Sequence, residues 1–431
     1  MRRLLIFYFS MIGFSEALLA QAFIPPMPAD LSATKVSLLT VGIGEDVYAR
    51  FGHTMIRVED QVNNLDYLVN WGMFDFSDPL FIPKFLRGIL IYKMSFSATQ
   101  ATVNYYRDVE RRSVIQDELS LTSNQKRQLM EKIVWNAQPE NVNYPYHYFL
   151  NNCSTIPRDY LDLVTQGYIR KSFSGNVGRM TYRDYIRANL ANNALFAWGL
   201  DVVLNSDSDR QLSKWQEMFY PLKLREYLST IQAIDDAGNA DPGRSFLVNN
   251  RVLADLPEPN GSAIDGYRLT WLVAGLPLLV LLFSLRIRRH EQSKQVAMPW
   301  HFRVFGLVCI WWGLTCGFFG LTHFSGWAFS MHTDLHRNFN MLIFWPLDVS
   351  VLILGIQMGL LGRSWNFSGF LGIGFWRKLA HFHIVFMPVY LMIWFSGLIR
   401  QDVSRVMVYM APLSLLYYLV LARFTEEAAD S

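Results

Sequence analysis

One cysteine, Cys153, stands in a setting that suits a nucleophilic sulfur. It lies in the segment Tyr144–Asp159, where a run of aromatic residues leads into Asn-Asn-Cys-Ser-Thr. Ser154 or Thr155 is suited to cap a helix, and Pro157 is tolerated in a first helical turn. The sequence therefore predicts that Cys153 lies at or just before a helix N-terminus, where unpaired amides and the helix dipole favour a thiolate.

The other two cysteines have a different setting. Cys309 and Cys316 share one apolar segment and are most simply interpreted as small buried residues. Cys153 is thus the only cysteine in the part of the chain that we expect to be exported. A lone cysteine in an oxidising compartment indicates a reactive thiol, and a buried inert cysteine is the alternative. The polar neighbours of Cys153 favour the reactive thiol.

A thiol nucleophile needs a base, and the exported portion offers two histidines, His53 and His147. We favour His53, because a Cys–His pair generally joins residues that are distant in sequence. Gly52, directly before it, permits a close approach of the backbone. His147 lies close to Cys153 in sequence, within an aromatic run where it could stack or line a pocket.

Two strand-like segments, Arg50–Val58 and Leu65–Trp71, are separated by a polar turn and predict a β-hairpin. With residues 61–64 as the loop, Met55 lies opposite Asn70. Side chains of a strand alternate between its two faces, so Asn70 then shares a face with His53, one diagonal step away. An amide oxygen there would hold the imidazole in one tautomer, which makes Asn70 the predicted third catalytic residue.

The composition excludes several classes of protein. Of 431 residues, 51% are hydrophobic and only 17% are charged, against about 25% in a typical soluble protein. The length favours two units. A net charge of +3 without a basic stripe gives no reason to expect a nucleic-acid partner. Residues 1–22 have the charged, apolar and small-residue order of a secretory signal, and an uncleaved N-terminal anchor is the alternative.

The second half of the chain predicts membrane-spanning helices. Five apolar runs approach or reach the roughly 20 residues that cross a bilayer. These runs are Leu269–Leu285, Val304–Leu321, Met341–Leu361, Ile384–Leu398 and Val406–Leu421. With the first domain outside the cytoplasm, Lys and Arg are concentrated in the inner loops, as the positive-inside rule expects. The inner loops hold Arg286, Arg288, Arg289, Lys294, Arg303, Arg363, Arg377, Lys378 and Arg423, whereas the outer loops hold Arg337, Arg400 and Arg405.

One outer loop, residues 327–340, carries an unusual set of polar side chains. We expect these side chains to face substrate or lipid head groups, and packing of the loop against a neck is the alternative. They are His332, Asp334, His336, Asn338 and Asn340. The spacing of the two histidines and the aspartate is only weak evidence for a metal, and we predict none. Asp348 is an ionisable residue within the third predicted span, which marks it as a functional candidate.

Three segments together resemble the Lnb-type family: Arg50-Phe-Gly-His-Thr-Met-Ile-Arg-Val58, Asn70-Trp-Gly-Met-Phe-Asp-Phe76 and Tyr148-Phe-Leu-Asn-Asn-Cys-Ser-Thr155. Asp334-Leu-His-Arg-Asn-Phe-Asn-Met-Leu342 resembles the external loop of that family. The family typically has Asn-Pro-Leu after this loop, where this chain has Trp345-Pro-Leu347. The resemblance implies an α+β fold: a circularly permuted papain-like domain, of the NlpC/P60 and lecithin:retinol acyltransferase type, followed by about five transmembrane helices.

The resemblance also implies N-acylation of bacterial lipoproteins at the inner membrane of a Gram-negative cell, with the catalytic domain in the periplasm. Cys153 would accept an acyl chain from a phospholipid as a thioester, and the lipoprotein amine would then take it, with His53 as the base. Backbone N–H groups at the helix start, with Asn152 and Ser154 in support, would form the oxyanion hole. No cofactor is implied. A membrane-tethered cysteine hydrolase, acting on peptidoglycan peptides or phospholipid, and a non-catalytic membrane scaffold remain as alternatives.

The expected order of domains follows from these segments. It is a signal peptide or anchor (1–22), an exported cysteine acyltransferase-like domain (23–234), a linker (235–266), a transmembrane helical domain (267–423) and a cytoplasmic tail (424–431).

Overall fold

The computed structural model describes residues 26–73, 80, 84, 87–259, 300–361, 373–411 and 414–415. The predicted signal segment, the first predicted span and the C-terminal tail lie outside these residues. The chain divides into two compact units. Unit 1 comprises Met1–Phe81, Leu90–Gly178 and Ser213–Pro259, and unit 2 comprises Ile82–Ile89, Arg179–Leu212 and Asn260–Ser431.

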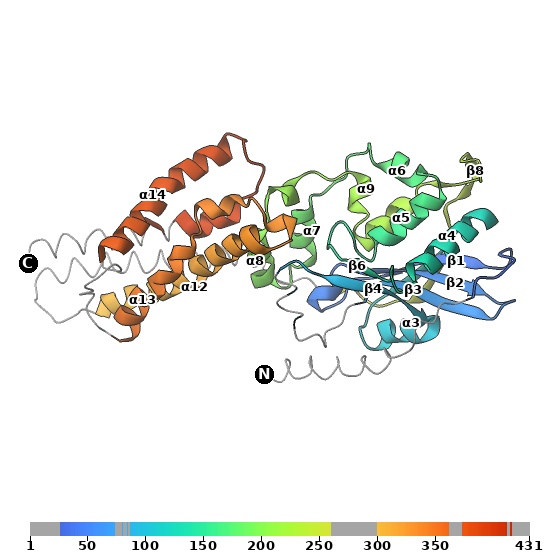
Figure 1. Cartoon of the computed structure of the whole chain (residues 1–431), viewed down its shortest axis with the longest axis horizontal. Helices are drawn as coiled ribbons and strands as arrows, with labels where there is room; N and C mark the ends of the chain where they lie inside the picture. Colours follow the sequence, from blue (N-terminus) through green and yellow to red (C-terminus); the bar gives the residue numbers. More distant parts are fainter. Residues whose placement is uncertain are drawn as a thin grey trace, which may run out of the picture. The chain divides into compact units, whose positions relative to one another are not determined.

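Unit 1 is built on a seven-stranded antiparallel sheet with the strand order β6-β4-β3-β2-β1-β5-β9 (Figure 1). The strands are β1 (Lys35–Val41), β2 (His53–Asp60), β3 (Leu65–Met73), β4 (Ile91–Ala98), β5 (Val114–Leu119), β6 (Asn143–Pro145) and β9 (Leu247–Ala254). The predicted hairpin is confirmed, because β2 pairs with β3. Its register is confirmed as well, because Met55 pairs with Asn70.

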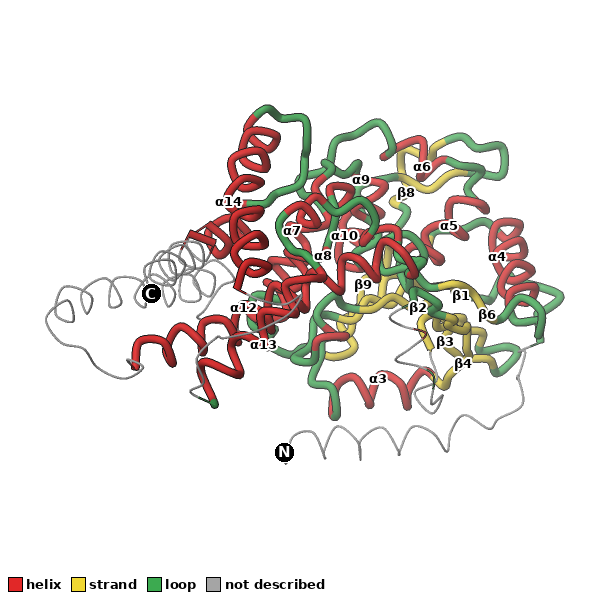
Figure 2. The backbone as a smooth tube through the Cα atoms, turned by 60° about the vertical axis from the view of Figure 1, so that its left-hand side comes forward, coloured by secondary structure: helices red, strands yellow, loops and turns green. Residues whose placement is uncertain are grey.

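Helices cover both faces of this sheet. Because side chains alternate along β1, this strand contributes to a core on each face. Val36 and Leu38 belong to a core that includes residues of α4 and α5, whereas Leu39 and Val41 pack in a second core with Val103 of α3. Figure 2 shows α3 on one side of the yellow strands and α4 and α5 on the other. The helices of unit 1 are α3 (Thr99–Asp108), α4 (Ser123–Asn136), α5 (Thr155–Val164), α6 (Tyr168–Phe173), α9 (Lys214–Glu217) and α10 (Pro221–Leu228), with a 3₁₀ turn η2 (Val47–Ala49).

The start of α4 is fixed by a reciprocal cap. The Thr122 side chain accepts the Gln125 N–H, and the Gln125 side chain accepts the Thr122 N–H. Two amide groups that the helix cannot satisfy are thereby bonded.

Within the segment 235–266, expected to be a linker, the described residues 240–254 form two strands. β8 (Ala240–Ser245) pairs with β7 (Gln232–Ile234), and β9 forms the last strand of the main sheet, paired with β5. Turn-forming residues are found in the loop before β8, within both strands and after β9, which makes this segment resemble a linker in composition. Residues 255–259 follow β9 without regular structure.

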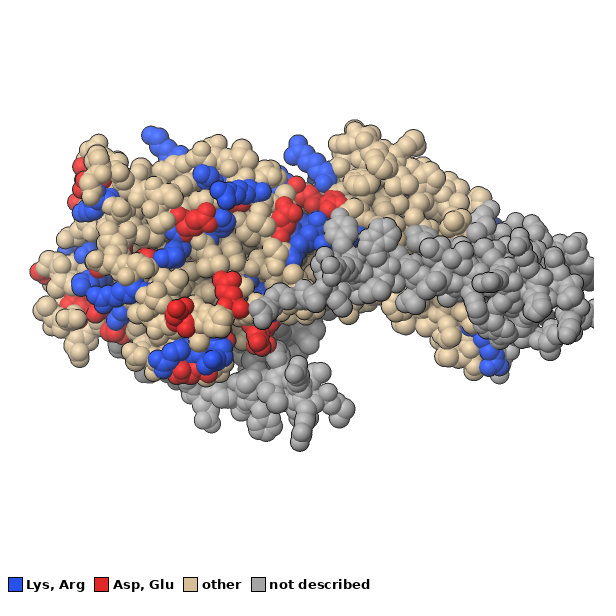
Figure 3. All heavy atoms as spheres, turned by 180° about the vertical axis from the view of Figure 1, so that it is seen from behind, with Lys and Arg blue, Asp and Glu red and all other residues tan. Residues whose placement is uncertain are grey.

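Unit 2 is helical. Its elements are α7 (Tyr182–Asn189), α8 (Ala194–Val203), η3 (Ser206–Asp209), α12 (Trp300–Phe329), η4 (Thr333–Leu335), η5 (Phe339–Leu342), η6 (Pro346–Ser350), α13 (Val351–Gly355), a π turn (Ile356–Leu360) and α14 (Ile373–Phe395), and residues 404–411 are also helical. Within the described residues, two helical stretches are long and apolar enough to cross a membrane, Gly306–Phe329 and Lys378–Phe395. Figure 3 shows charged side chains scattered over unit 1, whereas few appear among the tan atoms of α12 and α14.

The third predicted span, Met341–Leu361, is not a straight helix. The two apolar helical pieces Thr333–Leu342 and Pro346–Leu360 meet at a bend of 68°, so they form either a broken span or a re-entrant segment. Pro346 causes the break, because a proline disfavours helical backbone in the residue before it and Trp345 is extended, with φ −110° and ψ 141°. With this bent pair counted once, the described residues of unit 2 contain up to three candidate spans. The prediction of five is not confirmed.

Glycines let the bent segment approach α12 closely. A Cβ on Gly317 would lie 2.7 Å from the Val349 backbone nitrogen, and one on Gly320 would overlap the backbone of Trp345 and Pro346. Small residues at the contact between two apolar helices allow such close packing inside a bilayer.

A buried cluster of charged side chains joins α7 and α8 to the short segment that precedes the helix 404–411. Arg183, 1% exposed, donates to Asp209 at 2.6 Å and 3.0 Å and to the Asp201 carbonyl at 2.7 Å. Arg187 bridges Asp201 and Asp402 at 2.9 Å and 2.8 Å. Buried charges of this kind are retained only when paired, so the cluster fixes how these segments of unit 2 fit together.

Candidate active site

Cys153 lies in a tight turn directly before α5, as the sequence predicts. The helix cap is the side chain of Asn152, whose Oδ1 accepts the N–H groups of Ser154 and Thr155 at 2.8 Å and 2.9 Å. Ser154 precedes the first helical residue but makes no capping bond of its own. The amide of Asn152 therefore holds the turn in which Cys153 sits.

Asn152 and Ser154 are both occupied by bonds within unit 1. The Asn152 Nδ2 donates to the carbonyls of Tyr148 and Phe219 at 2.7 Å and 3.0 Å. The Ser154 hydroxyl donates to the Met218 carbonyl at 2.8 Å. Their expected part in an oxyanion hole is therefore limited to holding the turn, because their polar groups already have partners.

His53 and Asn70 form the hydrogen bond that the hairpin register predicts. The distance between His53 Nε2 and Asn70 Oδ1 is 2.7 Å. The Asn70 Nδ2 faces the Met73 sulfur at 3.6 Å, which leaves the amide oxygen pointing at the ring. Because an amide oxygen can only accept, the proton of a neutral His53 resides on Nε2, and Nδ1 keeps a lone pair that can accept a proton.

The backbone next to His53 also binds the sulfur of Cys153. The Thr54 N–H donates to this sulfur, which places the thiol beside the residue that follows His53. Gly72, at a bulge in β3, lies against both groups. A Cβ at this position would be 3.7 Å from His53 Cε1 and 3.8 Å from Cys153 Cβ. The three residues that the sequence selected for catalysis are thus brought together at one place in unit 1.

Burial sets the protonation states of this pair. Burial raises the pKa of the Cys153 thiol to about 11, and the Thr54 N–H and the positive charge of Arg112 offset only part of that rise. Burial likewise lowers the pKa of His53 to about 4, and the hydrogen bond that His53 donates to the Asn70 oxygen opposes this effect. At neutral pH the pair is therefore a neutral thiol next to a neutral imidazole, and not the thiolate that the helix N-terminus suggested. Such a thiol reacts when the imidazole removes its proton during attack.

Arg112 is a residue of the site that sequence reasoning missed. Its side chain is 3% exposed, donates to the Gly42 carbonyl at 2.8 Å and forms an ion pair with Glu110 at 2.6 Å. Its charge acts on both Cys153 and His53. No motif marks this arginine, because its nearness to the sulfur arises from the pairing of β1 with β5.

Three tyrosines lie near enough to Cys153 for a thiolate charge there to affect them. Tyr106, Tyr144 and Tyr146 each have a pKa raised by burial and, in smaller part, by the charge of a Cys153 thiolate. The hydroxyl of Tyr144 is buried and has no hydrogen-bond partner among the described residues. A buried donor without an acceptor is costly, which makes it available for a charge that develops during a reaction. The aromatic run before Cys153 was the signal in the sequence for this residue.

His147 is engaged in the turn that leads to the cysteine. Its Nδ1 accepts the Phe149 N–H at 3.2 Å, and its backbone pairs with Asn151. This local role agrees with the choice of His53 as the base.

A pocket of about 330 Å³ opens close to this turn in unit 1. Its lining includes Tyr144, Asn151 and Ile156, which flank Cys153 in sequence, together with the acidic Asp159 and Glu140. The pocket could therefore receive a substrate group that carries a positive charge.

The outer-loop residues predicted to face substrate instead hold unit 2 together. Asn338 and Asn340 are buried and donate to the carbonyls of Val203 and Val202, both at 2.7 Å. The His336 ring bonds the Ser330 carbonyl at 2.7 Å. The backbone carbonyl of Asp334 accepts the Asn205 N–H at 2.8 Å, and His332 lies against Gly88. In the part of the chain that the structure describes, no group of three His, Cys, Asp or Glu side chains could hold a metal ion.

Asp348 is buried and forms a hydrogen bond with His383 Nε2 at 2.8 Å, while its second oxygen accepts the Trp345 N–H at 3.0 Å. These bonds tie the bent segment to α14. They give the aspartate a structural partner within the apolar region of unit 2.

Comparison with known proteins gives one match. Residues 27–188 match the family model described as the Lnb N-terminal periplasmic domain. The matched region contains Cys153, His53 and Asn70. No curated protein and no solved structure matches the chain.

Proposed function

Because residues 27–188 belong to the Lnb N-terminal periplasmic domain family, we propose that this chain is a membrane-bound acyltransferase of lipoprotein maturation. It moves an acyl chain from a phospholipid to the N-terminal amine of a diacylated bacterial lipoprotein. Cys153 carries the acyl group between the two substrates, and no cofactor takes part.

In the first half-reaction, the Cys153 sulfur attacks the carbonyl carbon of the phospholipid ester while His53 Nδ1 takes the thiol proton. The ester C–O bond breaks, and His53 returns the proton to the departing glycerol oxygen. The products are a thioester on Cys153 and a lysophospholipid. The Tyr144 hydroxyl and the Cys153 N–H donate to the oxyanion that forms in between.

In the second half-reaction, the lipoprotein amine attacks the thioester carbonyl carbon. His53 takes a proton from the attacking nitrogen, the C–S bond breaks, and the proton passes to the departing sulfur. The products are an amide and a regenerated thiol. Asn70 keeps Nδ1 available in both steps, because it accepts the Nε2 proton throughout.

The observation that carries this proposal is the convergence of a Cys153 sulfur held by the Thr54 N–H with a His53 ring oriented by Asn70. The apolar helices of unit 2 support it as well, since two or three of those that the structure describes are long enough to cross a membrane and both substrates are lipids. We place the protein in the inner membrane with unit 1 in the periplasm.

The test is incubation of the full-length protein with a labelled phospholipid, with and without a diacylated lipoprotein, followed by mass spectrometry of Cys153 and of the lipoprotein N-terminus. We expect a labelled thioester without acceptor and a labelled amide with it. Cys153→Ser should abolish both products.

Two other outcomes of these experiments would indicate a hydrolase or a scaffold and not an acyltransferase. Release of free fatty acid at the same rate without acceptor would mean that water is the acceptor and the protein is a hydrolase. Full cellular function of Cys153→Ser would mean that the protein is a scaffold.

A further inference from the structure

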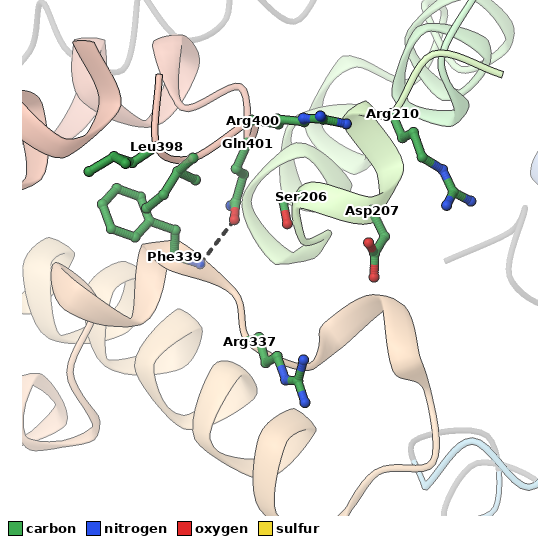
Figure 4. A pocket seen from close by; sticks show the side chains of 9 residues that line it. Ser206, Asp207, Arg210, Arg337, Phe339, Leu398, Arg400 and Gln401 are labelled. Carbon is green, nitrogen blue, oxygen red and sulfur yellow. Dashed lines mark hydrogen bonds between the residues drawn. The ribbon is translucent and has the colours of Figure 1, made fainter. Parts of the chain in front are cut away.

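A cationic pocket lies within unit 2, at the end of α14 (Figure 4). Its volume is about 330 Å³, and three arginines from distant parts of the sequence line it. Arg210 follows η3, Arg337 lies between η4 and η5, and Arg400 follows α14. Figure 4 shows Arg400 extending toward the segment that carries Arg210, with Arg337 on the opposite side of the pocket.

The three guanidinium groups differ from the other arginines of this region. Arg183, Arg187 and Arg405 all have carboxylate partners. The guanidinium groups of Arg210, Arg337 and Arg400 are exposed and have no hydrogen bond or ion pair to any residue that the structure describes. Their charges are therefore not neutralised by the protein and remain available to a ligand.

The pocket carries a net positive charge. Asp207 is its one acidic lining residue among the described residues, and it forms no ion pair with the three arginines. Three positive charges against one negative favour an anionic ligand. A guanidinium binds phosphate oxygens through paired N–H donors, which makes a phosphate group the best match for these side chains.

The floor of the pocket is rigid. Gln401 is buried, accepts the Phe339 N–H at 2.9 Å and donates to Asn338 Oδ1 at 2.9 Å. Asn338 in turn donates to the Val203 carbonyl at 2.7 Å, so the three segments that carry the arginines are bonded to one another. Arg337 is held in left-handed backbone, with φ 52°. The backbone that carries these arginines is therefore already ordered, so its ordering adds little to the cost of binding a ligand.

Apolar side chains lie next to these charges. Leu398 lines the pocket and is 80% exposed, and Phe395, at the end of α14, is 75% exposed. α14, which ends at Phe395, contains one of the two described helical stretches that are long and apolar enough to cross a membrane. A ligand that fits both features has a phosphate group and an apolar tail.

We propose that this pocket binds the phosphate of a phospholipid head group through Arg210, Arg337 and Arg400, with the lipid tails along Leu398 and Phe395. The site goes beyond the proposed acyl transfer and does not rest on it, because it requires none of the residues around Cys153. A free phosphate ion shares the same chemistry, and the experiment separates the two.

Binding is measured on the full-length Cys153→Ala protein in neutral detergent, so that no ester can be consumed by the thiol. Native mass spectrometry follows the retention of phosphatidylglycerol and of a diacylglycerol with the same chains. The variants replace all three pocket arginines with Gln or with Lys, and Arg251→Gln is the control. Arg251 is an exposed arginine on β9 of unit 1.

We expect the triple Gln variant to bind phosphatidylglycerol at least about tenfold more weakly than the control, as the loss of charge-assisted bonds implies. The triple Lys variant should keep part of the affinity, because charge remains while paired donation is lost. The diacylglycerol should bind weakly to every variant. Only variants whose melting temperature equals that of the parent protein are compared, because these variants are folded.

Three results would overturn the site. They are equal binding of phosphatidylglycerol by the control and by both triple variants, equal binding of diacylglycerol and phosphatidylglycerol, and displacement of the lipid by an equal concentration of inorganic phosphate. The last result would mean that the pocket serves a free anion.

Discussion

At the scale of single residues, the protonation of Cys153 and His53 determines how the site can react. The thiol has a pKa of about 11 and the imidazole a pKa of about 4, in both cases chiefly because of burial. The thiolate is therefore a minor species at neutral pH. Reactivity depends on proton removal by His53 within the reaction and not on a preformed ion pair.

These values predict the pH dependence of alkylation. The rate at which iodoacetamide modifies Cys153 should rise about tenfold per pH unit through the neutral range, because the thiolate fraction does so below the pKa. Arg112→Gln removes a positive charge and should move the curve to higher pH. Parallel measurements on Cys153→Ala subtract the remaining cysteines. An alkylation rate that no longer changes with pH above pH 7 would contradict a neutral Cys153 thiol beside a neutral His53.

The pKa of His53 falls when the protein folds, whereas the pKa of a histidine that gains an acidic partner rises. Its pKa in the folded protein lies below the ordinary value of 6.5, so the unfolded chain binds the proton more readily. Stability from this residue is present above about pH 6.5 and is lost as the pH falls toward about 4. Formation of the Cys153 thioester in the absence of acceptor, which needs His53 as the base, should likewise fail only as the pH approaches 4.

Asn70 should act as a positioning residue through the imidazole. Asn70→Ala removes the bond to Nε2, so we expect kcat to fall about tenfold or more, as loss of one hydrogen bond of about 1.4 kcal/mol implies. Asn70→Asp keeps an acceptor and should raise the pKa of His53, visible as a shift of the acid limb to higher pH. Gln100→Ala on α3 is the matched control, an exposed amide bonded to Asn104. Equal kcat in Asn70→Ala and Gln100→Ala would rule out the role.

Tyr144 should stabilise the oxyanion. Tyr144→Phe removes a buried hydroxyl that has no partner among the described residues, and we expect kcat to fall on the order of 10²-fold with little change in KM. Tyr160→Phe is the control, because the Tyr160 hydroxyl donates to Asn136 at 2.8 Å. Parent-like kcat in Tyr144→Phe would exclude it as a donor.

At the scale of elements, the parts that the sequence predicted are those with local signals. The hairpin of β2 and β3 could be placed to the residue because its polar loop and alternation fix the register, and with it the neighbourhood of His53 and Asn70. The helix start at Thr155 followed from capping residues and a proline. Both predictions depend only on neighbours in sequence.

The elements that the sequence missed depend on distant contacts. β9 joins the sheet beside β5 from a region rich in turn residues, and the bend at Pro346 interrupts an apolar run that reads as one span. Asn338 and Asn340 looked available for substrate because their partners, carbonyls at the end of α8, are far away in sequence. Burial and pairing of this kind cannot be read from composition.

The ionic cluster around α7 and α8 gives a prediction at this scale. Arg183→Met leaves Asp209 buried without its guanidinium and should destabilise unit 2 by about 3–5 kcal/mol. Thermal unfolding in detergent measures the change. Arg107→Met is the control, because its pair with Asp108 is exposed and is worth about 1 kcal/mol or less. A common melting temperature for the two variants would contradict this role of the cluster.

At the scale of the whole molecule, the division into a sheet unit and an apolar helical unit matches what composition predicts. The boundary differs: residues 179–212 group with the helical unit, where the sequence assigned them to the exported domain. Amphipathic helices look alike in both settings, so their partners decide the grouping. The substrates of the proposed reaction are lipids, which is consistent with a thiol domain on the same chain as helices of spanning length.

The central claim is that Cys153 carries the acyl chain as a thioester. The most direct measurement is intact-protein mass spectrometry after one addition of phospholipid without acceptor, comparing the parent with His53→Ala. The account predicts the mass of one acyl chain on Cys153 in the parent, removed by hydroxylamine, and none in His53→Ala. Release of lysophospholipid by the parent without any acyl group passing through Cys153 would contradict it.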